Sequence, residues 1–178
     1  RANLVRTAFL LLFHILNIFV ALISGLLALP LAIVGLVARC CGASNVCGGV
    51  ARMLAGLDIG LANFVGRNCL SHTRKLRTDP QISETRALSV ILYFASGKLI
   101  MGELSAFAII LTQALPVYAM SSKGGDFGGY LGDSFNFDDK PVVYAIVVVV
   151  CYMLGWAIVM LGAPLSVKLT RKYCTNQA

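Results

Sequence analysis

The sequence predicts an all-α integral membrane protein with three long transmembrane helices, the first kinked or possibly a hairpin, and an interfacial helix. The amino-acid composition predicts that the chain is a membrane protein. Of 178 residues, 58% are hydrophobic and 13% are charged, whereas a soluble domain carries about 25% charged residues. The apolar residues are also gathered into long segments, so lipid must be the solvent for much of the chain. We treat residues 1–178 as a single membrane domain.

The first apolar segment runs from about residue 5 to residue 38. Four polar residues interrupt it: Arg6, His14, Asn17 and Ser24. It is longer than the roughly 20 residues that one upright helix needs to cross the hydrocarbon. One long helix, tilted or kinked near Gly25 and Pro30, is favoured. A hairpin with two short arms is the alternative.

The second segment runs from about residue 87 to 119, and the third from about residue 142 to 167. The third has no charged residue and is rich in valine. A buried strand would also be rich in valine, but this run is far too long for a strand, so a helix is predicted.

The connections predict an orientation. The basic loop 39–86 holds seven basic and three acidic residues, and Lys168, Arg171 and Lys172 follow the third segment. The acidic, Gly-rich loop 121–140 has two lysines and four aspartates. The positive-inside rule puts the basic loop and the C-terminus on the cytoplasmic or equivalent side. The sequence does not indicate the organelle.

Within the basic loop, residues 46–66 form a less apolar segment that carries Arg52 and Asp58. An interfacial helix is the favoured interpretation, and a short or re-entrant fourth element is the alternative. Gly56 and Gly60 have the GxxxG spacing that lets helices approach closely.

Two ionisable residues, Lys98 and Glu103, lie in the second segment. Charges at membrane depth are costly and often functional. Five helical residues separate them by about 500°, so they do not stack as an i,i+4 pair. The favoured interpretation places Lys98 at the interface, where it snorkels to water. Contact with a partner helix and a substrate or proton path are the alternatives.

His14 is the only histidine in a predicted span. A hydrogen bond to another helix is favoured. Ligation of chlorophyll magnesium or haem iron is the alternative, which makes His14 the candidate cofactor-binding residue. Lipid is the other expected ligand of the chain.

Five of the six cysteines lie in the basic loop or the tail. Free thiols are expected, with Cys40, Cys41 and Cys47 as candidate palmitoylation sites beside the membrane. These three cysteines with Cys69 and His72 match no strong zinc template, so no metal site is predicted. Asp133, Asp138 and Asp139 lack the ligand spacing of a calcium loop.

Three stretches, "CCGASNVC", "GRNCLSHTRKL" and "VILYFASGKLIMG", occur in this order, the third at the opening of a span that is followed by a loop and a last span. The order resembles the C-terminal region of choline transporter-like proteins and covers residues 40–175. The matching residues are Cys40, Cys41, Gly66, Cys69, Ser71, Gly97, Lys98 and Leu99. Chains of that family are several times longer, so the resemblance implies a solute transporter or a fragment of one. No functional residue is carried over.

The sequence contains no hydrolase elbow, P-loop, dinucleotide fingerprint or HExxH motif, so we predict that it is not an enzyme. The favoured function is a non-catalytic membrane subunit that stabilises or assembles a larger complex, for example a respiratory or photosynthetic one. The alternatives are a transporter and a pigment- or haem-binding subunit. Expected partners are the bilayer and other membrane subunits. Nucleic acid is not expected, because the basic residues cluster beside apolar segments.

Overall fold

The computed structural model describes residues 2–41, 47–69, 75–76, 82–121 and 140–175. Every regular element among them is helical. The elements are α1 (Ala2–Cys40), α2 (Gly48–Asn68), α3 (Glu84–Tyr93), η1 (Phe94–Lys98), α4 (Leu99–Ile109), η2 (Ile110–Ala114), α5 (Leu115–Ser121) and α7 (Pro141–Cys174).

Three helical stretches are long and apolar enough to cross a membrane: Asn3–Cys40, Thr85–Ala119 and Pro141–Cys174. The prediction of an all-α protein with three such helices is therefore confirmed. Their ends lie within a few residues of those predicted, except that α7 continues to Cys174.

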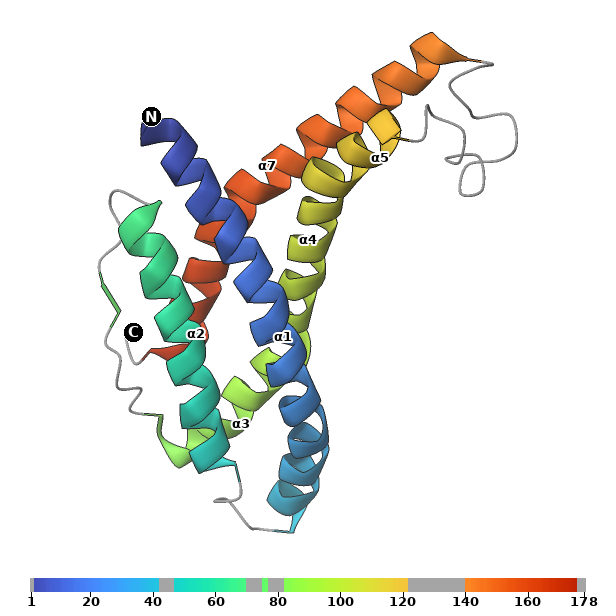
Figure 1. Cartoon of the computed structure of the whole chain (residues 1–178). Helices are drawn as coiled ribbons and strands as arrows, with labels where there is room; N and C mark the ends of the chain where they lie inside the picture. Colours follow the sequence, from blue (N-terminus) through green and yellow to red (C-terminus); the bar gives the residue numbers. More distant parts are fainter. Residues whose placement is uncertain (1, 42–46, 70–74, 77–81, 122–139, 176–178) are drawn as a thin grey trace.

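The first segment is one continuous helix, so the hairpin alternative is wrong. Helix α1 has 39 residues and contains Pro30. At 1.5 Å per residue it is about 58 Å long, roughly twice the hydrocarbon thickness. Figure 1 shows it changing direction in its lower half, the half that holds the proline. Proline removes one helical hydrogen bond and is a common cause of such bends.

The second span is one uninterrupted helical stretch made up of α3, η1, α4, η2 and α5. Its two five-residue segments, η1 and η2, are π-helical. Short π-helical segments inside α-helices occur frequently at functional sites. The first of them, η1, ends at Lys98, so Lys98 is a candidate functional residue.

The segment predicted as an interfacial helix is helical, as α2, but it packs into the bundle. It contacts α1, α3 and α7, and Figure 1 shows it running beside α1 in the opposite direction. Because α2 is less apolar, it is not one of the three helices that could cross a membrane. One face is nevertheless buried, and that face includes Asp58.

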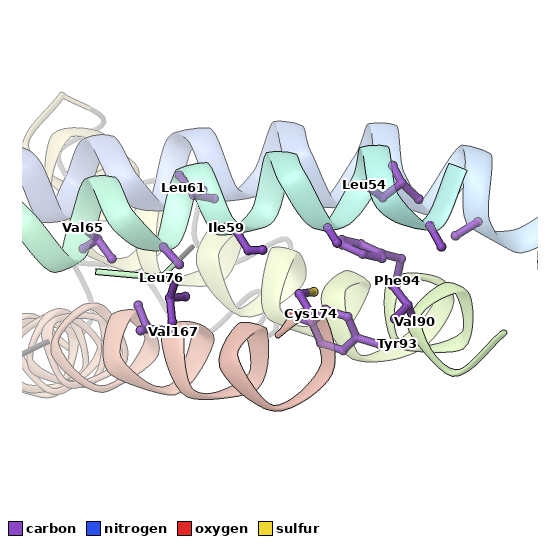
Figure 2. Close-up of a cluster of buried hydrophobic side chains, with 14 of the residues drawn as sticks. Leu54, Ile59, Leu61, Val65, Leu76, Val90, Tyr93, Phe94, Val167 and Cys174 are labelled. Carbon is purple, nitrogen blue, oxygen red and sulfur yellow. The ribbon is translucent and has the colours of Figure 1, made fainter. Parts of the chain in front are cut away.

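An apolar core forms where α2, the α3–η1 junction and α7 meet. Figure 2 shows Leu54 and Ile59 of α2 on one side, Val90 and Phe94 on another, and Val167 on α7. Burying such side chains stabilises the fold by about 1.5–3 kcal/mol each where water is the alternative. Where lipid is the alternative, close packing and hydrogen bonds must contribute the stability instead.

Helices approach closely at several glycines, of which Gly102 and Gly162 lie beside the residues discussed below. A Cβ atom added to Gly102 of α4 would lie 2.3 Å from the Cβ of Ala21 on α1, and one added to Gly162 of α7 would lie 3.0 Å from His14 Cε1. Gly56 and Gly60, the predicted GxxxG pair, have no atom within 4 Å of such a Cβ. The GxxxG spacing on α2 is therefore not what packs this helix against its described neighbours.

The ends of the helices agree with three crossings. Figure 1 shows the end of α1 and the starts of α2 and α3 at one end of the molecule, and the end of α5 and the start of α7 at the other. Arg86 Nη2 donates to the carbonyl of Lys172 at 3.5 Å, so the C-terminal end of α7 reaches the start of α3. Which of the two ends faces the cytoplasm stays a prediction. Most of the acidic loop lies outside the described residues.

Candidate functional site: a buried polar network

The centre of the bundle holds an ion pair. Lys98, the last residue of η1, donates from Nζ to Asp58 Oδ1 in the middle of α2. The two side chains are 0% and 1% exposed. The pair has no net charge, and this is the condition under which ionised groups are tolerated in a protein interior.

The second carboxylate oxygen of Asp58 has its own donors. Tyr93 donates its hydroxyl to Oδ2 at 3.1 Å, and Thr170 of α7 donates to the same oxygen at 2.8 Å. Asp58 thus connects α2 to the α3–η1 junction and to α7. Its carboxylate is shielded from water and hydrogen-bonded through both oxygens.

Lys98 has a second acceptor on α1, the side-chain amide of Asn17. Lys98 Nζ donates to Asn17 Oδ1 at 2.6 Å. The amide nitrogen of Asn17 lies 3.0 Å from the carbonyl of Met101 and 2.9 Å from the hydroxyl of Ser105, both on α4. Asn17 is fully buried, and it joins α1 to η1 and α4.

His14 continues the network away from the ion pair. Its Nδ1 lies 2.9 Å from Ser105 Oγ, and its Nε2 lies 3.0 Å from the carbonyl oxygen of Val159 on α7. A carbonyl only accepts, so Nε2 carries a proton. In the neutral ring Nδ1 only accepts, so it shares the single hydroxyl proton of Ser105 with the carbonyl oxygen of Met101, 2.9 Å from Ser105 Oγ, while Ser105 Oγ accepts from Asn17. Both ring nitrogens have protein partners, so a magnesium or iron ligand at His14 would have to displace one of them.

We call these seven residues the central polar network: Asp58, Lys98, Asn17, Ser105, His14, Tyr93 and Thr170. It joins α1, α2, the second span and α7 through side chains whose hydrogen bonds are made inside the chain. A buried polar network of this kind is stabilising only when its members are satisfied. These hydrogen bonds determine which faces of α1, α2, the second span and α7 pack together.

The favoured prediction for Lys98 is wrong. Its side chain does not snorkel to the membrane surface but turns inward to Asp58, because the buried carboxylate compensates the charge locally. Glu103 is exposed on α4. The two residues point in different directions, as the predicted rotation of about 500° requires.

Sequence reasoning did not single out Tyr93, Ser105 or Thr170, and it also missed Asp58, the anion of the network. A signal was present, however. The buried positions of α2 include Ala51, Leu54, Asp58, Leu61 and Val65, which recur every three or four residues. This spacing marks one helix face, and it places the aspartate on the apolar side. An acidic residue on the buried face of a helix requires a partner, and Lys98 was the isolated charge that could serve.

The cysteines are only partly available for modification. Cys40 and Cys41 are exposed, whereas Cys47 is buried with its thiol 3.8 Å from the carbonyl of Leu31. Palmitoylation at Cys47 would therefore require the start of α2 to move. Burial raises the pKa of the Cys69 thiol, against a smaller opposite effect of Arg6, which keeps that thiol protonated.

No cluster of three or more metal-binding side chains occurs among the described residues. His72 and the three aspartates of the acidic loop, at positions 133, 138 and 139, lie outside them.

Replacing Asn17 by alanine tests the link between α1 and the ion pair. The change removes one acceptor of Lys98 and the amide donor to Ser105. Because these groups are buried, we expect the free energy of unfolding to fall by about 1–3 kcal/mol. Reversible unfolding in mixed micelles measures it. Asn68→Ala is the matched control, since its amide bonds only the carbonyl of Phe64 within its own helix; an equal loss in both variants would contradict a special role for Asn17.

The chain matches no protein-family model, and no curated protein or solved structure matches it either. Its function therefore has to be argued from the geometry of its own residues.

Proposed function

We propose that the chain is a non-catalytic integral membrane subunit that stabilises or assembles a larger membrane complex. A respiratory or photosynthetic assembly is the natural host. The observation that carries the proposal is the contrast between a closed polar interior and a long apolar helix, α7, whose first half has few neighbours in the chain.

The first half of α7 diverges from α1 and α2 in Figure 1 and, among the described elements, lies beside the stretch formed by α4, η2 and α5. In the stretch of α7 from Pro141 to Leu154, Tyr144 is the one buried residue. The exposed large apolar side chains of this stretch are Val142, Val143, Ile146, Val149, Val150, Tyr152, Met153 and Leu154. A membrane-spanning helix of a partner subunit, packed against this half of α7, fits the divergence of the helices.

The central polar network supports a structural role. A transport path needs polar groups that exchange partners with a substrate or with water. Here the carboxylate of Asp58 and the ammonium of Lys98 are occupied by partners from the same chain. Such a network suits a rigid unit that presents fixed outer faces to other subunits.

A choline transporter-like solute transporter, or a fragment of one, is the second candidate. It is favoured by one observation: the lysine of the Gly97–Leu99 stretch, which carries the resemblance, is also the central cation of the network. An ionisable pair inside a membrane bundle is a frequent feature of transport sites.

Mild solubilisation of native membranes, native gel separation and mass spectrometry of the band that holds this chain test the proposal. We expect co-migration with other subunits in fixed proportion. A photo-crosslinking residue at Ile146 or Val150 should capture one of those subunits. Leu26, which is 76% exposed on α1, is the matched control position and should capture less.

Migration as a single chain or a homo-oligomer, with no specific crosslink at α7, would overturn the subunit proposal. In that case choline uptake by the chain reconstituted into vesicles tests the second candidate, and its dependence on Lys98 identifies the path.

A further inference from the structure

Two hollows on the outer surface of α2 and α7 share a basic lining. The larger, of about 610 Å³, is lined by residues of the C-terminal half of α2 and by Lys75, Leu76 and Val167. The smaller, of about 370 Å³, lies on α7 and is lined by Pro164, Leu165, Val167, Lys168 and Arg171. Val167 borders both, so the two hollows are neighbours on α7. We call them together the basic seam.

Four cations line the basic seam: Arg67, Lys75, Lys168 and Arg171. No aspartate or glutamate lines either hollow within the described part of the chain. The walls between the cations are apolar and include Phe64, Leu76 and Leu165. A ligand that fits this lining is itself amphipathic, with an anionic end and an apolar body.

Arg171 contributes a second and independent observation. Its Nε is buried and has no hydrogen-bond partner among the described residues. A buried guanidinium donor without an acceptor costs free energy, so such a group calls for an explanation. Because Nε itself has no exposed surface, an anionic oxygen in the smaller hollow would meet the rest of the Arg171 guanidinium and the charge of Lys168 beside it.

The position of Lys75 is fixed rather than incidental. Asn63 of α2 donates to the carbonyl of Leu76 at 2.9 Å and accepts from its backbone N–H at 2.7 Å. Figure 2 shows Leu76 between Val65 of α2 and Val167 of α7. This double hydrogen bond holds the neighbouring lysine at the rim of the larger hollow.

We propose that the basic seam binds the headgroup of an acidic phospholipid, with its phosphate against Arg171 and Lys168 and its apolar part along the walls of the seam. Basic pockets beside membrane helices bind acidic lipid headgroups by charge and hydrogen bonds. This inference is independent of the proposed subunit function, because a lipid site can stabilise a transporter equally well.

Native mass spectrometry of the detergent-purified full chain, titrated with phosphatidylglycerol and with phosphatidylcholine, tests the proposal. We expect tighter retention of phosphatidylglycerol. The double variant Lys168→Gln/Arg171→Gln should weaken that lipid about tenfold and leave phosphatidylcholine unchanged. Arg171→Lys keeps the charge but removes the planar guanidinium, and should also weaken phosphatidylglycerol.

The matched control is Arg39→Gln/Arg52→Gln, which removes the same charge from exposed positions elsewhere. An equal loss in both double variants would mean diffuse charge attraction only and would overturn the site. No preference for phosphatidylglycerol over phosphatidylcholine would overturn it as well. A thermal unfolding scan of each variant separates lost binding from lost folding.

Discussion

Replacing Lys98 by methionine should destabilise the bundle more than any other single change considered for this chain. Methionine has nearly the volume of the lysine stem, but it leaves the carboxylate of Asp58 buried without its counter-charge. Breaking a buried ion pair from one side costs about 3–5 kcal/mol. Reversible unfolding in mixed micelles should show a loss of this size, and Asp58→Asn should show a comparable one.

The double variant distinguishes an ion pair from two independent contributions. In Lys98→Met/Asp58→Asn no charge is left unpaired, so the loss should be smaller than the sum of the single losses by about 2 kcal/mol. Lys140→Met is the control, because Lys140 is exposed at the start of α7; its effect should stay within about 0.5 kcal/mol. Strict additivity of the two single losses would contradict the pairing.

Replacing Gly102 by leucine should have the next largest effect. A Cβ at this position already lies 2.3 Å from Ala21 Cβ, so a larger side chain must push α1 and α4 apart. Overpacking of this kind costs about 3 kcal/mol. The same displacement would lengthen the hydrogen bonds from Asn17 to Met101 and Ser105.

Gly56→Leu is the matched control for this change. It places the same side chain in a helix, but no atom lies within 4 Å of the added Cβ. Unfolding in micelles should be close to that of the unchanged chain, or slightly more stable because leucine favours the helix over glycine. An equal loss at both positions would show that the close approach of α1 and α4 does not limit stability.

The three spans could be predicted because apolar length is a local property. Each of the three long helices appears in the sequence as a run of apolar residues. In lipid such a run must be helical, because only a helix satisfies its backbone hydrogen bonds within the run. The single helix in the first segment also follows from length, since two hairpin arms would have been short. These features require no knowledge of which helices are neighbours.

The central polar network could not be predicted in the same way. Lys98 and Asp58 are separated by 40 positions, and Asn17 is a further 41 positions before Asp58. Only the folded arrangement shows that their helices present these residues to one another. The sequence favours snorkelling when the span is taken to begin at Leu99, because Lys98 then lies at the basic interface. The buried face of α2, which supplies the partner of Lys98, is hidden by the polar composition of that segment.

The central claim is that Lys98 lies inside the bundle against Asp58 and ties α2 to the membrane-spanning helices. Solid-state NMR of the chain in lipid bilayers, with ¹⁵N on the lysine side chains and ¹³C on the aspartate carboxylates, measures this contact directly. We predict a strong Nζ–Cγ dipolar coupling for one lysine, which disappears in Asp58→Asn and in Lys98→Met. The absence of this coupling in the unchanged chain, or its persistence in both variants, would contradict the ion pair between Lys98 and Asp58.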